Sequence, residues 1–241
     1  MNHYQFNGFR FVSLNQEKLT ETLSAKSKGH SVHFVAASTF FGSRKDPDFS
    51  SKLKDAILIA DSKPLQTYFK FKYGEFEGIR GSDFLRYYSL KSNANMILIG
   101  SEKKVTDELI SKLKLLNPKV RIALVINPPF KPDLSEESIH WEKEILKHSA
   151  DVVWVGLGSP KQDYIARQLA TNLNIHVIAA GAAFEFVSSV LPEAPGWMIS
   201  SHIEWLHRLI IEPKRLWKRY FFGNLYFIYL LIRDLVFSKN Q

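Results

Sequence analysis

The sequence predicts an α/β protein: a Rossmann-like, mostly parallel sheet with helices on both faces, followed by a basic and aromatic helical C-terminal appendage. Three observations indicate this fold. Short apolar runs recur along the chain, amphipathic helical patterns separate them, and the composition changes after about residue 195. Strands that alternate with helices are typical of parallel sheets, in which ligands bind at the carboxyl ends of the strands.

Six apolar runs have the length and composition of buried strands. They span residues 32–36, 56–60, 96–99, 120–126, 152–155 and 175–179. Three helical patterns lie between them, at residues 103–116, 135–148 and 160–173. We therefore expect a core domain over residues 1–195, which is long enough to bury a full hydrophobic core.

Residues 196–241 are expected to form the appendage. They contain seven Lys or Arg against three Asp or Glu, and three of the five tryptophans. Helices are expected at 197–211 and 214–222, with an interruption at Glu212-Pro213 and a further apolar run at 220–232 that includes Gly223 and Asn224. A membrane-spanning helix needs ~20 apolar residues. The pattern instead favours an amphipathic helix at a membrane interface.

The composition limits the classes of partner that this protein is expected to bind. A net charge of +8 indicates an anionic partner, either nucleic acid, a membrane surface or a phosphorylated ligand. No recognised nucleic-acid-binding motif occurs, so no nucleic-acid partner is expected. The chain has no cysteine and its eight histidines are scattered, so neither a metal nor another cofactor is expected. The N-terminus lacks the pattern of a secretory signal.

The stretch GLGSPKQ, at residues 156–162, joins a predicted strand to a predicted helix. Gly156 and Gly158 allow a tight turn and the close approach of a ligand. Ser159 is expected to cap the helix, Pro160 to be its first residue, and Gln162 to complete a capping box. The helix is therefore expected to begin here.

Two interpretations of this turn stay open. It could only cap a helix, or the helix N-terminus could face a diphosphate or a sugar, with Lys161 adding positive charge. Neither the dinucleotide-binding fingerprint nor a Walker A motif occurs, so the motifs do not indicate a nicotinamide enzyme.

Four blocks then follow in order: GLGSPKQD at 156–163, AAGAAFEF at 179–186, APGW at 194–197, and IEWLHRLIIEPKRLWKRY at 203–220. With them the chain resembles the WecG/TagA/CpsF family of bacterial glycosyltransferases (glycosyltransferase family 26) over roughly residues 30–224. The resemblance implies an inverting, metal-independent transfer of a sugar from a UDP-sugar to a polyprenyl-diphosphate-linked acceptor in surface polysaccharide synthesis. The implied sugar is N-acetylmannosamine, its uronate or another hexose. The implied location is cytoplasmic, peripheral on the inner face of the cell membrane.

The resemblance also implies roles for residues. Asp61 would be the catalytic base, although an Asp before Ser62 also commonly opens a turn. The implied donor-binding residues are Ser38, Thr39, Arg80, Gly156, Gly158, Ser159, Lys161, Gln162, Ala180, Gly181 and Glu185, the last near the uracil. The residues implied to stabilise the leaving group are Arg208, Arg215 and Arg219. Arg219 could instead face anionic lipid together with Lys218 and Arg233.

The chain departs from the family pattern around the donor sugar. Ala36 and Ser38 stand where Thr and Asn are usual, Glu185 stands for Asp, and Glu193-Ala-Pro stands for Arg-Ala-Pro. These departures predict an altered sugar specificity. The alternative function is a non-catalytic, UDP-sugar-binding membrane subunit of a polysaccharide assembly complex. Formation of a homo-oligomer is left open.

Overall fold

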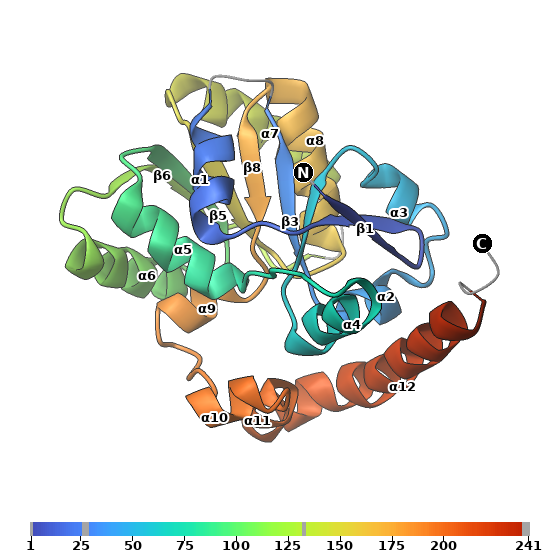
Figure 1. Ribbon diagram of the computed structural model, residues 1–241. Helices are drawn as coiled ribbons and strands as arrows, with labels where there is room; N and C mark the ends of the chain where they lie inside the picture. The colour runs from blue at the N-terminus through green and yellow to red at the C-terminus, as the bar shows by residue number, and fades with distance from the viewer. Residues whose placement is uncertain (1, 26–28, 132–133, 238–241) are drawn as a thin grey trace.

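A computed structural model describes residues 2–25, 29–131 and 134–237 (Figure 1). One sheet runs through the protein in the strand order β1-β2-β4-β3-β8-β7-β5-β6. Its strands are β1 (His3–Phe6), β2 (Phe9–Val12), β3 (Ser31–Val35), β4 (Ile57–Ala60), β5 (Asn95–Gly100), β6 (Arg121–Ile126), β7 (Val152–Gly156) and β8 (His176–Ala179). β1 pairs with β2 antiparallel and the other neighbours pair in parallel. The predicted α/β fold and its six predicted strands are confirmed.

Helices cover both faces of the sheet (Figure 1). One face packs against α1 (Gln16–Ser24), α5 (Gly81–Lys91), α6 (Lys103–Leu116) and α9 (Ala183–Val187). The other packs against α2 (Ala37–Ser43), α3 (Phe49–Lys52), α4 (Lys63–Tyr73), α7 (Ser135–Lys147) and α8 (Lys161–Leu173). Successive residues of a strand point to opposite faces. In β4, Ile57 and Ile59 accordingly enter one core while Leu58 and Ala60 enter the other.

The β1–β2 hairpin was not expected from the sequence. Its strands have four residues each, and exposed polar residues such as Gln5 and Arg10 alternate with buried phenylalanines. The signal is therefore a short two-residue alternation rather than an apolar run. The hairpin contributes Phe6, Phe9 and Phe11 to a phenylalanine-rich core under α2 and α4.

The C-terminal segment forms α10 (Gly196–Ser200), α11 (Glu204–Ile211) and α12 (Pro213–Phe237). Two expectations were wrong here. The predicted helix 197–211 is divided at Ser201–Ile203, where His202 has a φ of 67°. The helix predicted over 214–222 extends to Phe237. The predicted interruption at Glu212-Pro213 is confirmed, because α11 ends at Ile211 and α12 begins at Pro213, whose fixed φ suits the first helical position.

α12 continues through Gly223 and Asn224 as one helix of 25 residues. Its buried residues, Leu216, Tyr220, Gly223, Phe227 and Leu230, recur at helical spacing along one stripe. At Gly223 an added Cβ would lie 3.7 Å from Phe41 and 3.9 Å from Ser38. The missing side chain thus lets α12 approach α2 closely, and α12 crosses beneath α2 and α4 (Figure 1).

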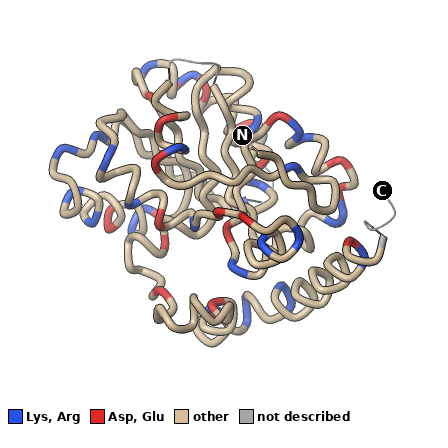
Figure 2. Tube along the Cα trace, in the orientation of Figure 1, with Lys and Arg blue, Asp and Glu red and all other residues tan. Residues whose placement is uncertain are grey.

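The opposite stripe of α12 is apolar and exposed. We call it the outer stripe, and its residues are Trp217, Phe221, Phe222, Leu225, Ile228, Tyr229, Ile232, Leu235 and Val236. No helix in the described part of the chain is long and apolar enough to cross a membrane. Basic and acidic residues are mixed along most of the chain (Figure 2).

Candidate active site

Several predicted site residues meet at the carboxyl edge of the sheet. Asp61 follows β4, Ala36 follows β3, Gly158 follows β7, and Ala180 and Gly181 follow β8. Because β3, β4, β7 and β8 run parallel, their ends meet at one edge of the sheet. This is the edge at which open α/β sheets bind ligands.

Asp61 is partly buried, and its carboxylate is held in place. The backbone N–H of Gly81, at the start of α5, donates to Oδ1 of Asp61 over 2.8 Å. Burial, the largest cause, and the neighbouring Glu204 raise the pKa of Asp61 to about 6, against the lowering effects of the Gly81 N–H, Arg80 and Arg208. A carboxylate with such a pKa is ionised at neutral pH and is still basic enough to accept a proton from a hydroxyl.

Arg80 immediately precedes α5 and is surrounded by carboxylates. Its Nη2 lies 2.9 Å from Oε1 of Glu204 and 3.6 Å from Oε1 of Glu193, and its Nη1 lies 3.3 Å from Oδ1 of Asp83. Burial alone would lower the pKa of Arg80, but Glu204 and Asp83 raise it above its ordinary value. The structure thus brings Arg80 to the site with its charge already compensated.

Gln162 joins two of the loops. Its Oε1 accepts hydrogen bonds from the backbone N–H of Gly158 over 2.9 Å and of Gly181 over 3.1 Å. The predicted capping box is therefore wrong. The glutamine bonds to the strand-end loops, and α8 begins after Pro160 with no side-chain cap. Gly158 and Gly181 have φ values of 78° and 61°, which glycine adopts without steric cost.

The other predicted residues of the β7–α8 turn, Gly156, Ser159 and Lys161, have different surroundings. At Gly156 an added Cβ would lie 2.9 Å from the ring of Phe184, so only glycine fits there without displacing the ring. Among the described residues, the buried hydroxyl of Ser159 has no hydrogen-bond partner. Lys161 is engaged elsewhere, because its Nζ donates to the carbonyl of Lys131 over 2.8 Å.

Glu185, at the other end of the site, lies in α9. Its Oε1 accepts a hydrogen bond from the hydroxyl of Ser101 over 3.0 Å. Its buried Oε2 has no partner within the described chain and remains a free acceptor. Ser101, which follows β5, could not be predicted from the sequence, because a lone serine after a strand carries no distinctive signal.

Ser38 and Thr39 are both buried in α2. The hydroxyl of Thr39 accepts a hydrogen bond from the N–H of Ala36 over 3.3 Å. The hydroxyl of Ser38 instead lies 3.2 Å from Nη2 of Arg219 in α12. Thr39 thus stabilises the turn after β3, while Ser38 connects that turn to the appendage.

The three predicted appendage arginines lie in different surroundings. Arg208 stacks over Phe186 at 5.0 Å, and its buried Nε has no partner in the described ranges. Burial lowers the pKa of Arg219, which points at Ser38. Arg215 pairs with Glu212, and its side chain is 64% exposed. The structure therefore brings Arg208 and Arg219 against the core and leaves Arg215 at the surface.

A buried His–Asp pair beneath the site could not be predicted from the sequence either. Nδ1 of His33, in β3, lies 2.9 Å from Oδ1 of Asp163 in the first turn of α8, and neither side chain is more than 3% exposed. Asp163 adjoins Gln162, so the pair anchors the N-terminus of α8 to the sheet. The two residues are 130 positions apart, and no local pattern connects them.

The described residues of the candidate site form no metal-binding group. Within residues 2–25, 29–131 and 134–237, no group of three His, Asp or Glu side chains could hold a metal ion. Asp46 and Asp48 do form an Asp-x-Asp sequence. The carboxylate of Asp46, however, is bonded to Lys52, Tyr164 and the N–H of Asp48.

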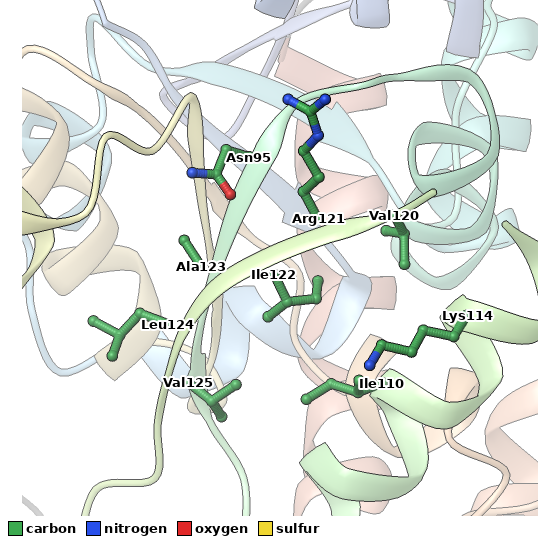
Figure 3. A pocket seen from close by; sticks show the side chains of 9 residues that line it. All are labelled: Asn95, Ile110, Lys114, Val120, Arg121, Ile122, Ala123, Leu124 and Val125. Carbon is green, nitrogen blue, oxygen red and sulfur yellow. The ribbon is translucent and has the colours of Figure 1, made fainter. Parts of the chain in front are cut away.

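A groove of about 700 Å³ lies along the edge strand β6 (Figure 3). Its lining residues are Asn95, Ile110, Lys114 and Val120 to Val125. Most are aliphatic, and the lining contains no carboxylate and none of the predicted site residues. The groove therefore lacks the groups that acid–base chemistry needs, and the carboxyl edge remains the candidate site.

The fold and the carboxyl edge together define a class: open, mostly parallel α/β sheets, whose ligand sites lie at the carboxyl ends of the strands. The particular family follows from comparison with known proteins. The chain belongs to the glycosyl transferase WecG/TagA/CpsF family, which it matches over residues 4–241. The family resemblance inferred from the sequence is confirmed.

Two relatives are N-acetylglucosaminyldiphosphoundecaprenol N-acetyl-β-D-mannosaminyltransferases. The protein from Bacillus subtilis (strain 168) is 30% identical over 130 residues, covering 54% of this chain and 48% of the relative. The protein from Bacillus spizizenii is 27% identical over 121 residues, covering 50% and 45%. A third, the UDP-Gal:α-D-GlcNAc-diphosphoundecaprenol β-1,4-galactosyltransferase of Shigella boydii, is 26% identical over 148 residues, covering 61% of each chain. The matches thus span about half to three fifths of these relatives.

Proposed function

We propose that this protein is a glycosyltransferase that moves a sugar from a UDP-sugar to a polyprenyl-diphosphate-linked sugar at a membrane surface. The observation that carries the proposal is Asp61, a carboxylate with a pKa of about 6 at the carboxyl edge of the sheet. Family membership and the names of three relatives, all of which act on an undecaprenyl-diphosphate-linked sugar, support it.

The proposed reaction is a single displacement that inverts the anomeric centre. The acceptor hydroxyl oxygen attacks C1 of the donor sugar and forms the new C–O bond. The bond from C1 to the phosphate oxygen breaks, and its electron pair leaves with UDP. Asp61 takes the hydroxyl proton as general base and later releases it to solvent.

The donor is proposed to lie across the ends of β7 and β8. Gln162 holds the Gly158 and Gly181 loops together, which supports a preformed donor site. The free Oε2 of Glu185 is an acceptor for the N–H of uracil. Arg208 and Arg219 supply the positive charge that a departing diphosphate requires, so the proposed mechanism uses no metal ion.

The outer stripe of α12 is proposed to bind the membrane that holds the acceptor. Exposed aromatic and aliphatic side chains lie along the helix, and Lys214 and Lys218 near its start can attract anionic lipid. We propose a peripheral position on the cytoplasmic face. In this arrangement residues 196–241 act as an appendage that completes the site of the core in residues 1–195.

A transfer assay tests the function. The purified chain is incubated with UDP-N-acetylmannosamine or UDP-galactose, with and without N-acetylglucosaminyl-diphosphoundecaprenol, and UDP release is measured. We expect release that depends on the acceptor and is unchanged by EDTA. Tight UDP-sugar binding without transfer to any acceptor would instead favour the non-catalytic membrane subunit.

A further inference from the structure

The strongest charge network at the site surrounds Arg80. We call it the Arg80 cluster, and its members are Arg80, Asp83, Arg86, Glu193 and Glu204. Glu193 lies at its centre. Its Oε2 is 2.9 Å from Nη2 of Arg86, its Oε1 is 3.3 Å from Nη1 of Arg86, and its Oε1 is 3.6 Å from Arg80. Three carboxylates therefore face two guanidinium groups.

The cluster adjoins the candidate base. Asp61 accepts the hydrogen bond of Gly81, the residue next to Arg80. Arg80 and Glu204 also lie within electrostatic reach of the Asp61 carboxylate. A hydroxyl bonded to Asp61 lies ~3 Å from it, and the attacked carbon ~3 Å further. The attacked carbon of a bound sugar thus lies roughly 6 Å from Asp61, so a sugar that extends toward Arg80 and Glu204 meets the Arg80 cluster.

A sugar carboxylate would find no available cation within the Arg80 cluster, and Arg208, whose Nε has no partner in the described residues, is the cation proposed for the departing diphosphate. Carboxylates are bound best by the two-pronged fork of an arginine. The Arg80 fork is already taken by Glu204 and Glu193, and the Arg86 fork by both oxygens of Glu193. A second carboxylate would instead meet like charges, which is how binding sites reject a wrong ligand. A neutral hydroxyl or acetamido group can donate a hydrogen bond to the same carboxylates.

We propose that the Arg80 cluster restricts this protein to donors whose sugar carries no carboxylate, with Glu193 as the specificity-determining residue. This inference rests on the proposed function, because it assumes that a UDP-sugar binds at the carboxyl edge. It excludes the uronates from the donors that the sequence left open and retains the neutral hexoses and N-acetylhexosamines.

The test uses donors that differ only at C6. UDP-glucose is compared with UDP-glucuronate, and UDP-N-acetylmannosamine with its uronate, by calorimetric titration of the full chain. We expect each uronate to bind about tenfold more weakly than its neutral partner, a difference of about 1.4 kcal/mol. Glu193→Gln keeps an oxygen for Arg86 but removes the charge, and should reduce the difference to less than about threefold.

Glu144→Gln is the matched control. Glu144 pairs with Lys147 on α7, outside the Arg80 cluster. Its variant loses the same charge as Glu193→Gln, so the tenfold difference in affinity between neutral and uronate donors should persist. Thermal unfolding checks that the variants are folded, and Glu204→Gln provides a second neutralisation of the cluster. Uronates that bind wild type as tightly as the neutral sugars, or a difference that Glu193→Gln leaves unchanged, would overturn the inference. Absence of binding by UDP itself would instead overturn the proposed function on which the inference rests.

Discussion

The backbone N–H of Gly81 donates a hydrogen bond of 2.8 Å to Oδ1 of Asp61, and so joins the start of α5 to the end of β4. This bond orients the carboxylate and partly offsets the effect of burial on its pKa. Within the described part of the chain the second oxygen, Oδ2, accepts no hydrogen bond, which leaves it for a substrate hydroxyl. Asp61 is therefore both a structural acceptor and the candidate base.

Asp61→Asn should separate these two roles. The amide oxygen can still accept from Gly81, but it cannot take a proton, so kcat should fall by about 10²–10⁴-fold. The folded-state pKa is about 6 against 3.8 for an ordinary Asp, so the folded protein holds the proton more tightly. Stability of wild type should then fall as pH rises from 4 to 6.

The variant carries no ionised carboxylate at this buried position, so it should be more stable than wild type at pH 7 by roughly 3 kcal/mol. The two proteins should be equally stable below about pH 3, where Asp61 is protonated in both the folded and the unfolded states. Urea unfolding at several pH values measures this. Unchanged turnover in the variant would rule out Asp61 as the base.

The pH profile of kcat/KM should show an acidic limb near pH 6, because Asp61 must be ionised to accept a proton. Glu204 raises that pKa and also compensates Arg80. Glu204→Gln should therefore move the limb to lower pH. Glu144→Gln should leave the limb in place, and a limb that stays near pH 6 in both variants would show that Glu204 does not act on Asp61.

Gln162→Ala should weaken donor binding. It removes the acceptor shared by the N–H groups of Gly158 and Gly181, at a cost to stability of about 1–3 kcal/mol. We expect the Kd for UDP to rise about tenfold. Gln162→Glu retains an acceptor oxygen and should recover most of the affinity, whereas a loss of affinity equal to that of the alanine variant would contradict the clamp.

Arg219→Ala should reduce kcat more than Arg215→Ala does. Arg219 is directed inward at Ser38, while Arg215 is largely exposed and paired with Glu212. We expect a loss of about 10²-fold for Arg219, typical of a removed charge-stabilising group, and less than about threefold for Arg215. Steady-state kinetics with saturating donor and acceptor measure both. The reverse order would mean that the appendage rearranges before reaction.

Leu225→Asp combined with Ile228→Asp should reduce sedimentation with anionic liposomes by about tenfold or more, because two inserting side chains are lost from the outer stripe. Leu115→Asp on α6 is the control, since Leu115 is also exposed, at 79%, but lies outside α12. Equal losses in both proteins would show that nonspecific charge, rather than the outer stripe, controls binding. Point variants are preferable to deletion of residues 196–241, because Leu216, Tyr220, Phe227 and Leu230 belong to the folded core.

Much of the sheet could be predicted from the sequence because its central strands are buried on both faces. Residues 152–155 form an uninterrupted apolar run, and such runs have few alternatives to a strand in a parallel sheet. The β1–β2 hairpin is buried on one face only, so its sequence shows just a short alternation of polar and apolar residues. In α12, the sequence showed Gly223 as a break, whereas packing against α2 makes it a point of close approach.

The candidate site could likewise be predicted only in part. Asp61 and the glycines follow predicted strands, so their place at the carboxyl edge could be predicted. The direction in which a side chain points depends on neighbours that are distant in sequence. Arg80 meets Glu204 across 124 positions, and Ser38 meets Arg219 across 181. Such pairs have no local signature, which is why the sequence placed Gln162 in a capping box and left Arg219 undecided.

The rings of Phe6 and Phe227 lie 5.8 Å apart and share one core, although β1 and α12 are at opposite ends of the described chain. Contacts between such distant segments form late in folding, because a long loop must close first. During synthesis Phe6 can pack against Phe40 and Phe69 before α12 is made, but its contact with Phe227 must wait for that helix. A ribosome that stalls before α12 would leave open the side of this core that Phe227 and Leu230 cover, so the proposed membrane-binding helix also completes the core.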